Sequence, residues 1–260
     1  EANFHIIIGQ TTAAKNIFKC VTKAVLEGGD LILEPIASAE AVLSEEEKEA
    51  GVVLVDIGGG TTDIAIFQEN IIRHTAVIPF GGDVITEDVK EGCSIIRKHA
   101  EELKVKFGSA LASENRDDEI VAIPGLRGRP PKEISLKNLA SIIQARMEEI
   151  IEHVYYEIKN SGYEKKLIAG IVLTGGGALL KHLPQLTEFI TGMDTRIGYP
   201  NEHLANNVSD ELASPMYATG IGLVIEGMRR YYKENEALKE KSRGKDLEQD
   251  NTEDQPAPTR

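Results

Sequence analysis

The sequence predicts an α/β fold, and three observations support this class. Two runs rich in branched apolar residues, at 52–57 and 167–174, each lead into a glycine triplet. Runs of valine and isoleucine that end at glycine are typical of β-strands. Other segments carry apolar residues at every third or fourth position, as amphipathic helices do. Strands that alternate with such helices favour a sheet covered by helices.

The composition is that of an acidic globular protein. The chain has 260 residues, a formal net charge of −13 and 41% hydrophobic residues, which is enough for one large or two small domains. The charge argues against binding to nucleic acid, because phosphate contacts need clustered lysine and arginine. Cys20 and Cys93 show no metal-binding spacing, so we expect both to be reduced and structural.

The sequence also carries indications of location. No apolar run approaches the ~20 residues that span a bilayer, and no signal peptide opens the chain, so we expect a cytoplasmic protein. Glu1 directly precedes an expected strand at 4–8, with no initiator methionine. We therefore expect the chain to be part of a longer protein.

The first fifty residues are expected to contain two helices and a second short strand. Apolar positions at helical spacing follow the two threonines at 11–12, which can cap a helix, and the glycine pair at 28–29 stops it. A short strand at 31–33 then leads into a second helix at 34–43, which begins Glu-Pro.

Residues 52–67 are expected to form a β-hairpin whose loop can hold a phosphate. The loop contains Gly58, Gly59, Gly60, Thr61 and Thr62. Glycines let the backbone approach a ligand, and such a turn can direct successive N–H groups at an anion. Asp56 ends the first strand, where a carboxylate can hold Mg²⁺ through water. The alternative is a tight hairpin with Asx-turn chemistry and no ligand; the flanking acids and threonines favour the ligand.

The segment after the hairpin predicts a third strand and then helices. Residues 72–79 read as a strand of an antiparallel meander. Beyond it, apolar residues from Ile85 to Phe107 form one buried stripe, which Gly92 divides into two helices. A strand at 119–123, a turn-rich basic connection and a long helix capped by Ser135 follow.

A second glycine triplet, Gly175, Gly176 and Gly177, follows the buried run at 167–174. A strand that leads through glycines into a helix start can bind an anion or a nucleoside, although close packing of strand on helix also calls for glycine. An edge strand at 195–200 follows. From 233 onward the sequence is charged and lacks aromatic residues, so we expect a disordered linker at 233–260.

Two of these motifs carry a resemblance. The segment 56–63, Asp-Ile-Gly-Gly-Gly-Thr-Thr-Asp, resembles the second phosphate loop of the actin, sugar-kinase and heat-shock-chaperone superfamily. The segments 128–135 and 142–150 resemble, more narrowly, the FtsA family of bacterial cell-division proteins, and 215–223 resembles the closing helix of that family. The resemblance implies an actin-like (ribonuclease-H-like) ATPase fold, of which this chain is the second half with an inserted subdomain. It divides the chain into the end of a first-half domain at 1–50, an ATP-binding subdomain at 51–83 and 165–232, and the inserted subdomain at 84–164.

The resemblance also implies a site for ATP and Mg²⁺. Asp56 would hold the metal, and Glu34 would position the attacking water; the alternative for Glu34 is a helix-start carboxylate favoured by the helix dipole. Glu101 would accept the ribose hydroxyls and Lys104 would lie along the adenine, whereas spacing alone also allows an exposed ion pair. The expected nucleotide-binding residues are Asp56, Gly58, Gly59, Gly60, Thr61, Thr62, Gly81, Gly82, Glu101, Lys104, Gly175, Gly176 and Gly177.

The function that the resemblance implies is that of an ATP-binding, at most slowly hydrolysing protein. It would polymerise with itself, bind the C-terminal peptide of the tubulin-like FtsZ through 84–164, and anchor the FtsZ ring to the inner face of the cell membrane. A basic loop with Arg127, Arg129 and Lys132 could pair with that peptide. The membrane contact would use a C-terminal amphipathic helix that this chain does not contain. The alternatives are a sugar kinase, a heat-shock-type chaperone ATPase and a scaffold that binds no nucleotide.

Overall fold

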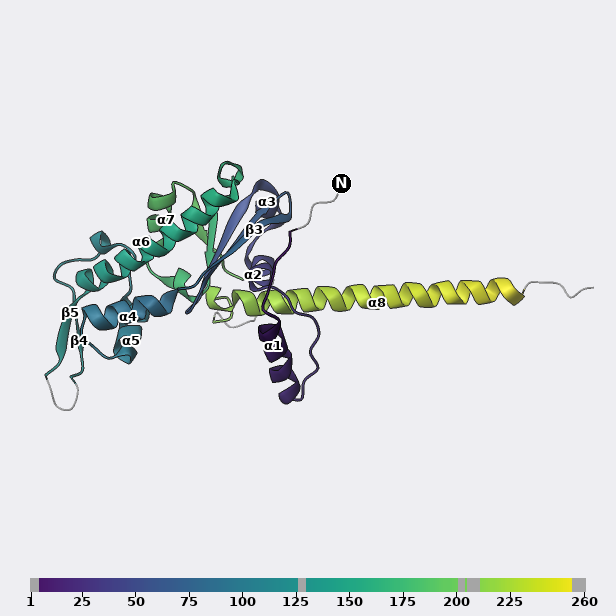
Figure 1. Cartoon of the computed structure of the whole chain (residues 1–260), viewed down its shortest axis with the longest axis horizontal. Coiled ribbons are helices and arrows are strands. Elements are labelled where there is room, and N and C mark those ends of the chain that lie inside the picture. Colours follow the sequence, from purple (N-terminus) through teal and green to yellow (C-terminus); the bar gives the residue numbers. More distant parts are fainter. Residues whose placement is uncertain (1–4, 126–129, 201–203, 205–210, 254–260) are drawn as a thin grey trace, which may run out of the picture.

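The structure is a computed structural model that describes residues 5–125, 130–200, 204 and 211–253 (Figure 1). In the described residues the main sheet has five strands in the order β3-β2-β1-β6-β7, and a separate pair joins β4 to β5. The strands are β1 (Val52–Ile57), β2 (Thr62–Gln68), β3 (Ile71–Ile78), β4 (Ile120–Ile123), β5 (Lys132–Ser135), β6 (Ile171–Thr174) and β7 (Thr195–Ile197).

Helices precede, interrupt and follow the strands along the chain. They are α1 (Thr11–Lys23), α2 (Glu34–Val42), α3 (Glu45–Ala50), α4 (Gly82–Gly92), α5 (Arg97–Phe107), α6 (Leu136–Ser161), α7 (Leu183–Thr191) and α8 (Ala218–Glu253). Short 3-10 turns lie at Ala112–Glu114, Glu164–Lys166, Gly176–Leu179 and Pro215–Tyr217.

The hairpin of β1 and β2 lies inside the sheet, and β3 continues it as the antiparallel meander that the sequence predicts. β2 pairs antiparallel with β1 and with β3, whereas β6 runs parallel to β1 and aligns Thr174 with Asp56. Parallel neighbours bring their carboxyl ends to one edge of a sheet, which in such folds is where ligands bind. The two glycine triplets, which follow β1 and β6, therefore meet at the same edge.

The two faces of β1 serve two separate cores. Val53, Val55 and Ile57 face the core that contains α4, α6 and α7, whereas Val52 and Leu54 face α2 and α8. This alternation follows from the two-residue period of a strand. Because both faces are covered, the strand reads as a continuous apolar run rather than an alternating one.

Helices α2 and α8 cross at very short range on the second face. A Cβ added to Gly222 of α8 would lie 1.7 Å from the carbonyl oxygen of Ala37 of α2. The buried residues of α2 are small ones, mainly alanine. The Ala-Ser-Ala sequence that follows Glu34-Pro35 thus has a packing role: it lets two helix backbones approach.

Two expected strands near the start of the chain are wrong. Residues 5–8 and 31–33 are extended or irregular, and in the described residues no strand pairs with them; Phe4 lies outside the described residues. An extended segment without a neighbour has no hydrogen-bond ladder to hold it. The helix between them is confirmed, although it ends at Lys23, before the glycine pair.

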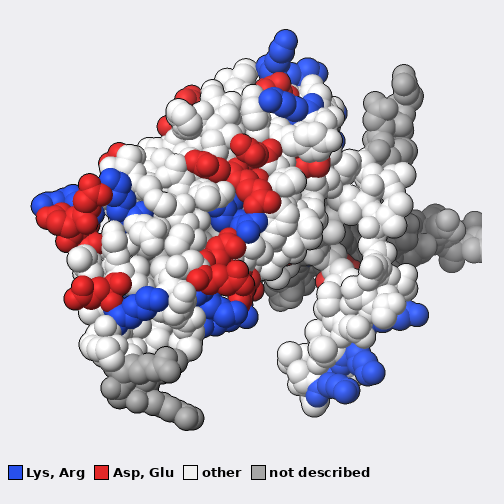
Figure 2. All heavy atoms as spheres, turned by 60° about the vertical axis from the view of Figure 1, so that its left-hand side comes forward, with Lys and Arg blue, Asp and Glu red and all other residues white. Residues whose placement is uncertain are grey.

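The disorder predicted from residue 233 is also wrong as far as Glu253, because α8 continues to that residue and projects from the body (Figure 1). Low apolar content excludes a packed core, but Glu, Lys, Leu and Gln are good helix formers. The helices of the described residues include none with the length and apolarity needed to cross a membrane. On the face in Figure 2, acidic and basic side chains are intermixed over the body.

Ion pairs to Glu40 of α2 join three of the helices. Lys48 of α3 is 5% exposed, and its ammonium lies 2.9 Å from Oε1 of Glu40 on α2 and 3.1 Å from Glu45. Arg229 of α8 contacts the other oxygen of Glu40 at 2.6 Å. Burial raises the pKa of Glu40, but the hydrogen bonds and charges of Lys48 and Arg229 outweigh it and hold this pKa below its usual value.

We predict that Glu40→Gln lowers the free energy of unfolding at pH 7 by about 2 kcal/mol, because Lys48 loses its less exposed partner. A lowered native pKa stabilises the fold above the carboxyl's ordinary pKa of ~4.3 and ceases to do so as the pH falls through the native value. Urea unfolding at several pH values should therefore show wild type and variant converging on acidification. Glu45→Gln, at the exposed partner, is the control and should cost about 0.5 kcal/mol or less; a difference independent of pH would contradict the assignment.

Candidate functional site

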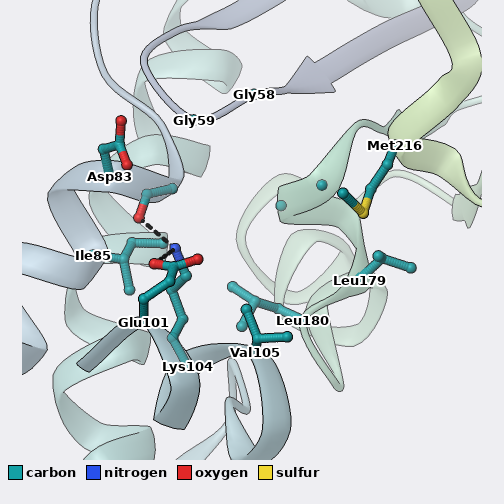
Figure 3. Close-up of a pocket in the computed structure, with 13 residues that line it drawn as sticks. Gly58, Gly59, Asp83, Ile85, Glu101, Lys104, Val105, Leu179, Leu180 and Met216 are labelled. Carbon is teal, nitrogen blue, oxygen red and sulfur yellow. Dashed lines mark hydrogen bonds and ion pairs between the residues drawn. The ribbon is translucent and has the colours of Figure 1, made fainter. Parts of the chain in front are cut away.

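A pocket of about 280 Å³ opens where the two glycine loops meet α4 and α5 (Figure 3). Its polar edge comes from the β1–β2 loop and the start of α4, and its apolar wall comes from α5 and the segment after β6. The lining residues are Gly58, Gly59, Gly82, Asp83, Ile85, Glu101, Lys104, Val105, Gly176, Gly177, Leu179, Leu180 and Met216.

The β1–β2 loop is held against the first turn of α4. The backbone N–H of Gly82 donates to the carbonyl of Gly58 at 2.9 Å, and that of Asp83 donates to the carbonyl of Gly59 at 2.8 Å. The first backbone N–H groups of a helix have no acceptor within the helix. Here two carbonyls of the loop accept from two of them. These two amides of α4 therefore hold the loop in place.

The second glycine loop lies directly against the end of β1. A Cβ on Gly177 would come 2.3 Å from Cγ2 of Ile57, and one on Gly175 would come 2.4 Å from Oδ1 of Asp56. Gly175 also has a φ of +82°, which other residues rarely adopt. Close packing against β1 therefore requires glycine at 175 and at 177. Gly176 and Gly177 also line the pocket.

Glu101 and Lys104 form an ion pair on α5 that is tied to α4. The Lys104 ammonium lies 2.8 Å from Glu101 Oε2, 2.9 Å from the Gly82 carbonyl and 2.8 Å from the Thr86 hydroxyl. The i,i+3 ion pair that spacing alone allowed is therefore present, but it is exposed at only one end: 46% of the Glu101 side chain is exposed and 12% of the Lys104 side chain. Burial raises the pKa of Glu101, but hydrogen bonds from Lys104 and Thr86 outweigh this and lower it.

Asp56 lies behind the loop rather than in the pocket lining. It is 5% exposed and accepts hydrogen bonds from Ser38 of α2 at 2.8 Å and from Thr219 of α8 at 3.4 Å. Burial raises its pKa, and so does the charge of Asp63. Burial, Asp63 and Asp56 likewise raise the pKa of Glu34, against the lowering effect of a hydrogen bond with Thr219.

These three carboxylates fit a hydrated magnesium ion better than a directly ligated metal. No set of three His, Cys, Asp or Glu side chains in the described part of the chain is arranged to hold a metal ion. Mg²⁺ keeps several waters and is commonly bound through one or two carboxylates together with substrate phosphates. Burial raises the pKa of all three carboxyls, and the charge of Asp63 further raises the pKa of Asp56 and of Glu34. A nearby cation would offset the repulsion between these carboxylates.

The structure brings together about half of the site residues predicted from sequence. Gly58, Gly59, Gly82, Glu101, Lys104, Gly176 and Gly177 line the pocket. Glu34, Asp56, Gly60, Thr61, Thr62, Gly81 and Gly175 do not. Two of the latter have local partners: Thr62 is buried and donates to the Phe80 carbonyl at 3.0 Å, and Thr61 donates to Asp63 at 2.9 Å.

Sequence reasoning missed the apolar wall of the pocket and the threonine behind it. Val105, Leu179 and Met216 are well exposed for apolar side chains and border the opening, but nothing in their spacing distinguishes them from core residues. Thr86 contacts both members of the α5 pair, although no motif marks it. Arg127 and Arg129 of the predicted basic loop lie outside the described residues.

Comparison with known proteins agrees with this architecture. The family model described as "Cell division protein FtsA" matches residues 53–222. Proteins of that name from Pseudomonas aeruginosa and Neisseria meningitidis are 44% and 40% identical over 88% and 86% of the chain. The matches cover 55% and 54% of those proteins, so the chain spans about half the length of the curated relatives it matches.

A solved structure shares the fold at lower identity. The crystal structure of MreB5 of Spiroplasma citri bound to ADP superposes with a TM-score of 0.67 and 22% identity, over 86% of this chain and 68% of that one. This confirms the expected actin-like fold class. With a family model that matches residues 53–222 and relatives at 44% and 40% identity, the chain belongs to the FtsA family of cell division proteins.

Proposed function

We propose that this chain is the nucleotide-binding half of an FtsA-family protein and that it takes ATP with Mg²⁺. The observation that carries the proposal is the pocket in which two glycine loops, Glu101 and Lys104 converge. In support, MreB5, whose structure was solved with ADP, has the same fold. In this proposal 51–83 and 165–232 form the nucleotide-binding subdomain, and 84–164 is the inserted one.

Each part of the pocket has a distinct role in the proposal. The amides of Gly59 and Gly60 face the phosphates, because the N–H of Gly58 donates to the Thr61 carbonyl at 2.9 Å within the loop. Glu101 accepts the ribose hydroxyls. The stem of Lys104 lies along the base while its ammonium stays bonded to α4, as long basic side chains allow. Gly176 and Gly177 let the nucleoside lie against backbone, and Val105, Leu179 and Met216 supply apolar contact. Asp56 and Glu34 would hold the waters of Mg²⁺, which when bound would neutralise phosphate charge.

The proposed role of the whole protein follows from the family. An FtsA-family protein would assemble with copies of itself, bind the C-terminal peptide of FtsZ through 84–164, and connect the FtsZ ring to the membrane at the division site through its own C-terminal helix. ATP would act by favouring one conformation, because a ligand shifts an equilibrium only through differential contacts. Family membership disfavours the sugar-kinase and chaperone alternatives, and the nucleotide-free scaffold remains as an outcome of the test.

We predict that Gly176→Val weakens binding of ADP to the chain by about tenfold or more, because the branched side chain occupies part of the pocket. A Cβ at this position meets Met216 Cγ at 3.7 Å, an ordinary contact, so Gly176→Ala is the matched control and should lose about threefold or less. An NMR titration of both variants and wild type with ADP would measure this. Equal affinity of wild type and the valine variant would place the nucleotide elsewhere, and no binding by wild type would favour the scaffold.

A further inference from the structure

Thr86 is a fully buried polar residue at the centre of the contacts between α4 and α5. Its side chain is 0% exposed, and it is absent from the pocket lining. Its hydroxyl lies 3.1 Å from the Gly82 carbonyl and 2.8 Å from the Lys104 ammonium, and it also contacts Oε2 of Glu101. Since a hydroxyl has one proton and two lone pairs, it donates to the carboxylate, the stronger acceptor, and accepts from Lys104.

The ammonium of Lys104 is fully committed to the protein. It has three N–H donors, and the structure gives it three partners: the Gly82 carbonyl, the Thr86 hydroxyl and Glu101 Oε2. A bound phosphate would therefore have to compete with three short contacts for this charge. The lysine is placed to brace α4 rather than to bind phosphate.

The contacts continue from α4 into the glycine loop. The carbonyl of Gly82 receives the Lys104 ammonium, while the N–H of the same residue donates to the Gly58 carbonyl at 2.9 Å. The next residue, Asp83, holds Gly59 in the same way at 2.8 Å. One continuous set of hydrogen bonds thus runs from α5 through the first turn of α4 to the loop, as the dashed lines in Figure 3 show for its α5 end.

We propose that Thr86 is a positioning residue that, together with Lys104, fixes the β1–β2 glycine loop relative to α5. The inference rests on the proposed nucleotide site and extends it: the nucleoside side of the pocket and the phosphate side are coupled through the first turn of α4. Ordering the Glu101–Lys104 pair against a ribose then orders the loop amides that face the phosphates. Thr86 does this without touching the nucleotide.

The first test needs no nucleotide. Hydrogen exchange at the amides of Gly82 and Asp83, followed by NMR, reports directly on the bonds to the loop. In Thr86→Val exchange should quicken by about tenfold, the equivalent of one hydrogen bond, while Thr86→Ser keeps the hydroxyl and should stay near wild type. Lys104→Met, which keeps the stem and loses the charge, should match the valine variant. If the exchange rates of both amides are unchanged in Thr86→Val and in Lys104→Met, the positioning role proposed for Thr86 and Lys104 is overturned.

The second test measures coupling through the ratio of two affinities. Wild type should bind ADP about tenfold more tightly than adenosine, and Thr86→Val should reduce this preference to about twofold or less, with the serine variant restoring it. If Thr86 had a purely structural role, the valine variant would bind ADP and adenosine more weakly by the same factor. The ratio of the two affinities would then be unchanged, and this result would overturn the coupling. If wild type binds neither ligand, the proposed nucleotide site and the coupling both fail. The exchange measurement still decides whether Thr86 and Lys104 fix the glycine loop.

Discussion

The 260-residue chain is expected to bind ATP weakly, with a Kd of about 0.1–1 mM, and to show no measurable hydrolysis. Phosphoryl transfer depends on positioning and charge stabilisation around the γ-phosphate. Among the described residues that line the pocket, Lys104 is the only cation, and its ammonium is bonded to α4 and Glu101. The triphosphate would meet the glycine loop on one side and water on the other.

The expected loss can be expressed in hydrogen bonds. A charge-assisted hydrogen bond to a phosphate oxygen contributes about 1.5–3 kcal/mol. If the side of the triphosphate that faces water lacks two such bonds, binding is weaker by about a hundredfold or more than in a site that supplies them. Calorimetry and a phosphate-release assay would measure binding and hydrolysis, with the full-length P. aeruginosa relative in parallel, since the chain matches 55% of it. Low-micromolar affinity or steady turnover in the chain itself would show that the described pocket suffices.

Gly222→Ala is expected to destabilise the fold by about 3 kcal/mol or more, at the upper end of the range for overpacking. The added Cβ would lie 1.7 Å from the carbonyl oxygen and 2.4 Å from the carbonyl carbon of Ala37. Both are backbone atoms of α2, so no side chain can rotate away. The helices would have to separate, which would loosen the core formed by Ala39, Val42 and Leu54 with Ala218.

The same helix supplies the control. Gly220 lies two residues earlier on α8, and a Cβ there would meet nothing within 4 Å. Gly220→Ala should therefore stabilise the chain by about 0.5–1 kcal/mol, because glycine inside a helix is unfavourable relative to alanine. Urea unfolding of the two variants would show shifts of opposite sign. A Gly222→Ala variant as stable as wild type would mean that α2 and α8 do not cross as closely as the structure shows.

The strands of the hairpin and the helix α6 could be predicted because their signals are local. The β-branched run at 52–57 and its neighbours fix the hairpin, and the apolar stripe of α6 fixes that helix, since periodicity follows from backbone geometry alone. The expected strands at 31–33 and before residue 9 failed for the complementary reason. Strand formation requires a partner, and a single segment does not reveal whether it has one.

The sequence by itself determined which residues are candidates, and the tertiary structure decided what each one contacts. Glycine loops, an acid and a Glu-x-x-Lys pair were visible as motifs. The structure placed Asp56 against Ser38 and Thr219, residues 18 and 163 positions away, and it made Thr86 the link between Lys104 and the loop. A hydrogen bond depends on distances of a few tenths of an ångström between segments far apart in the chain, and spacing along the sequence does not contain that information.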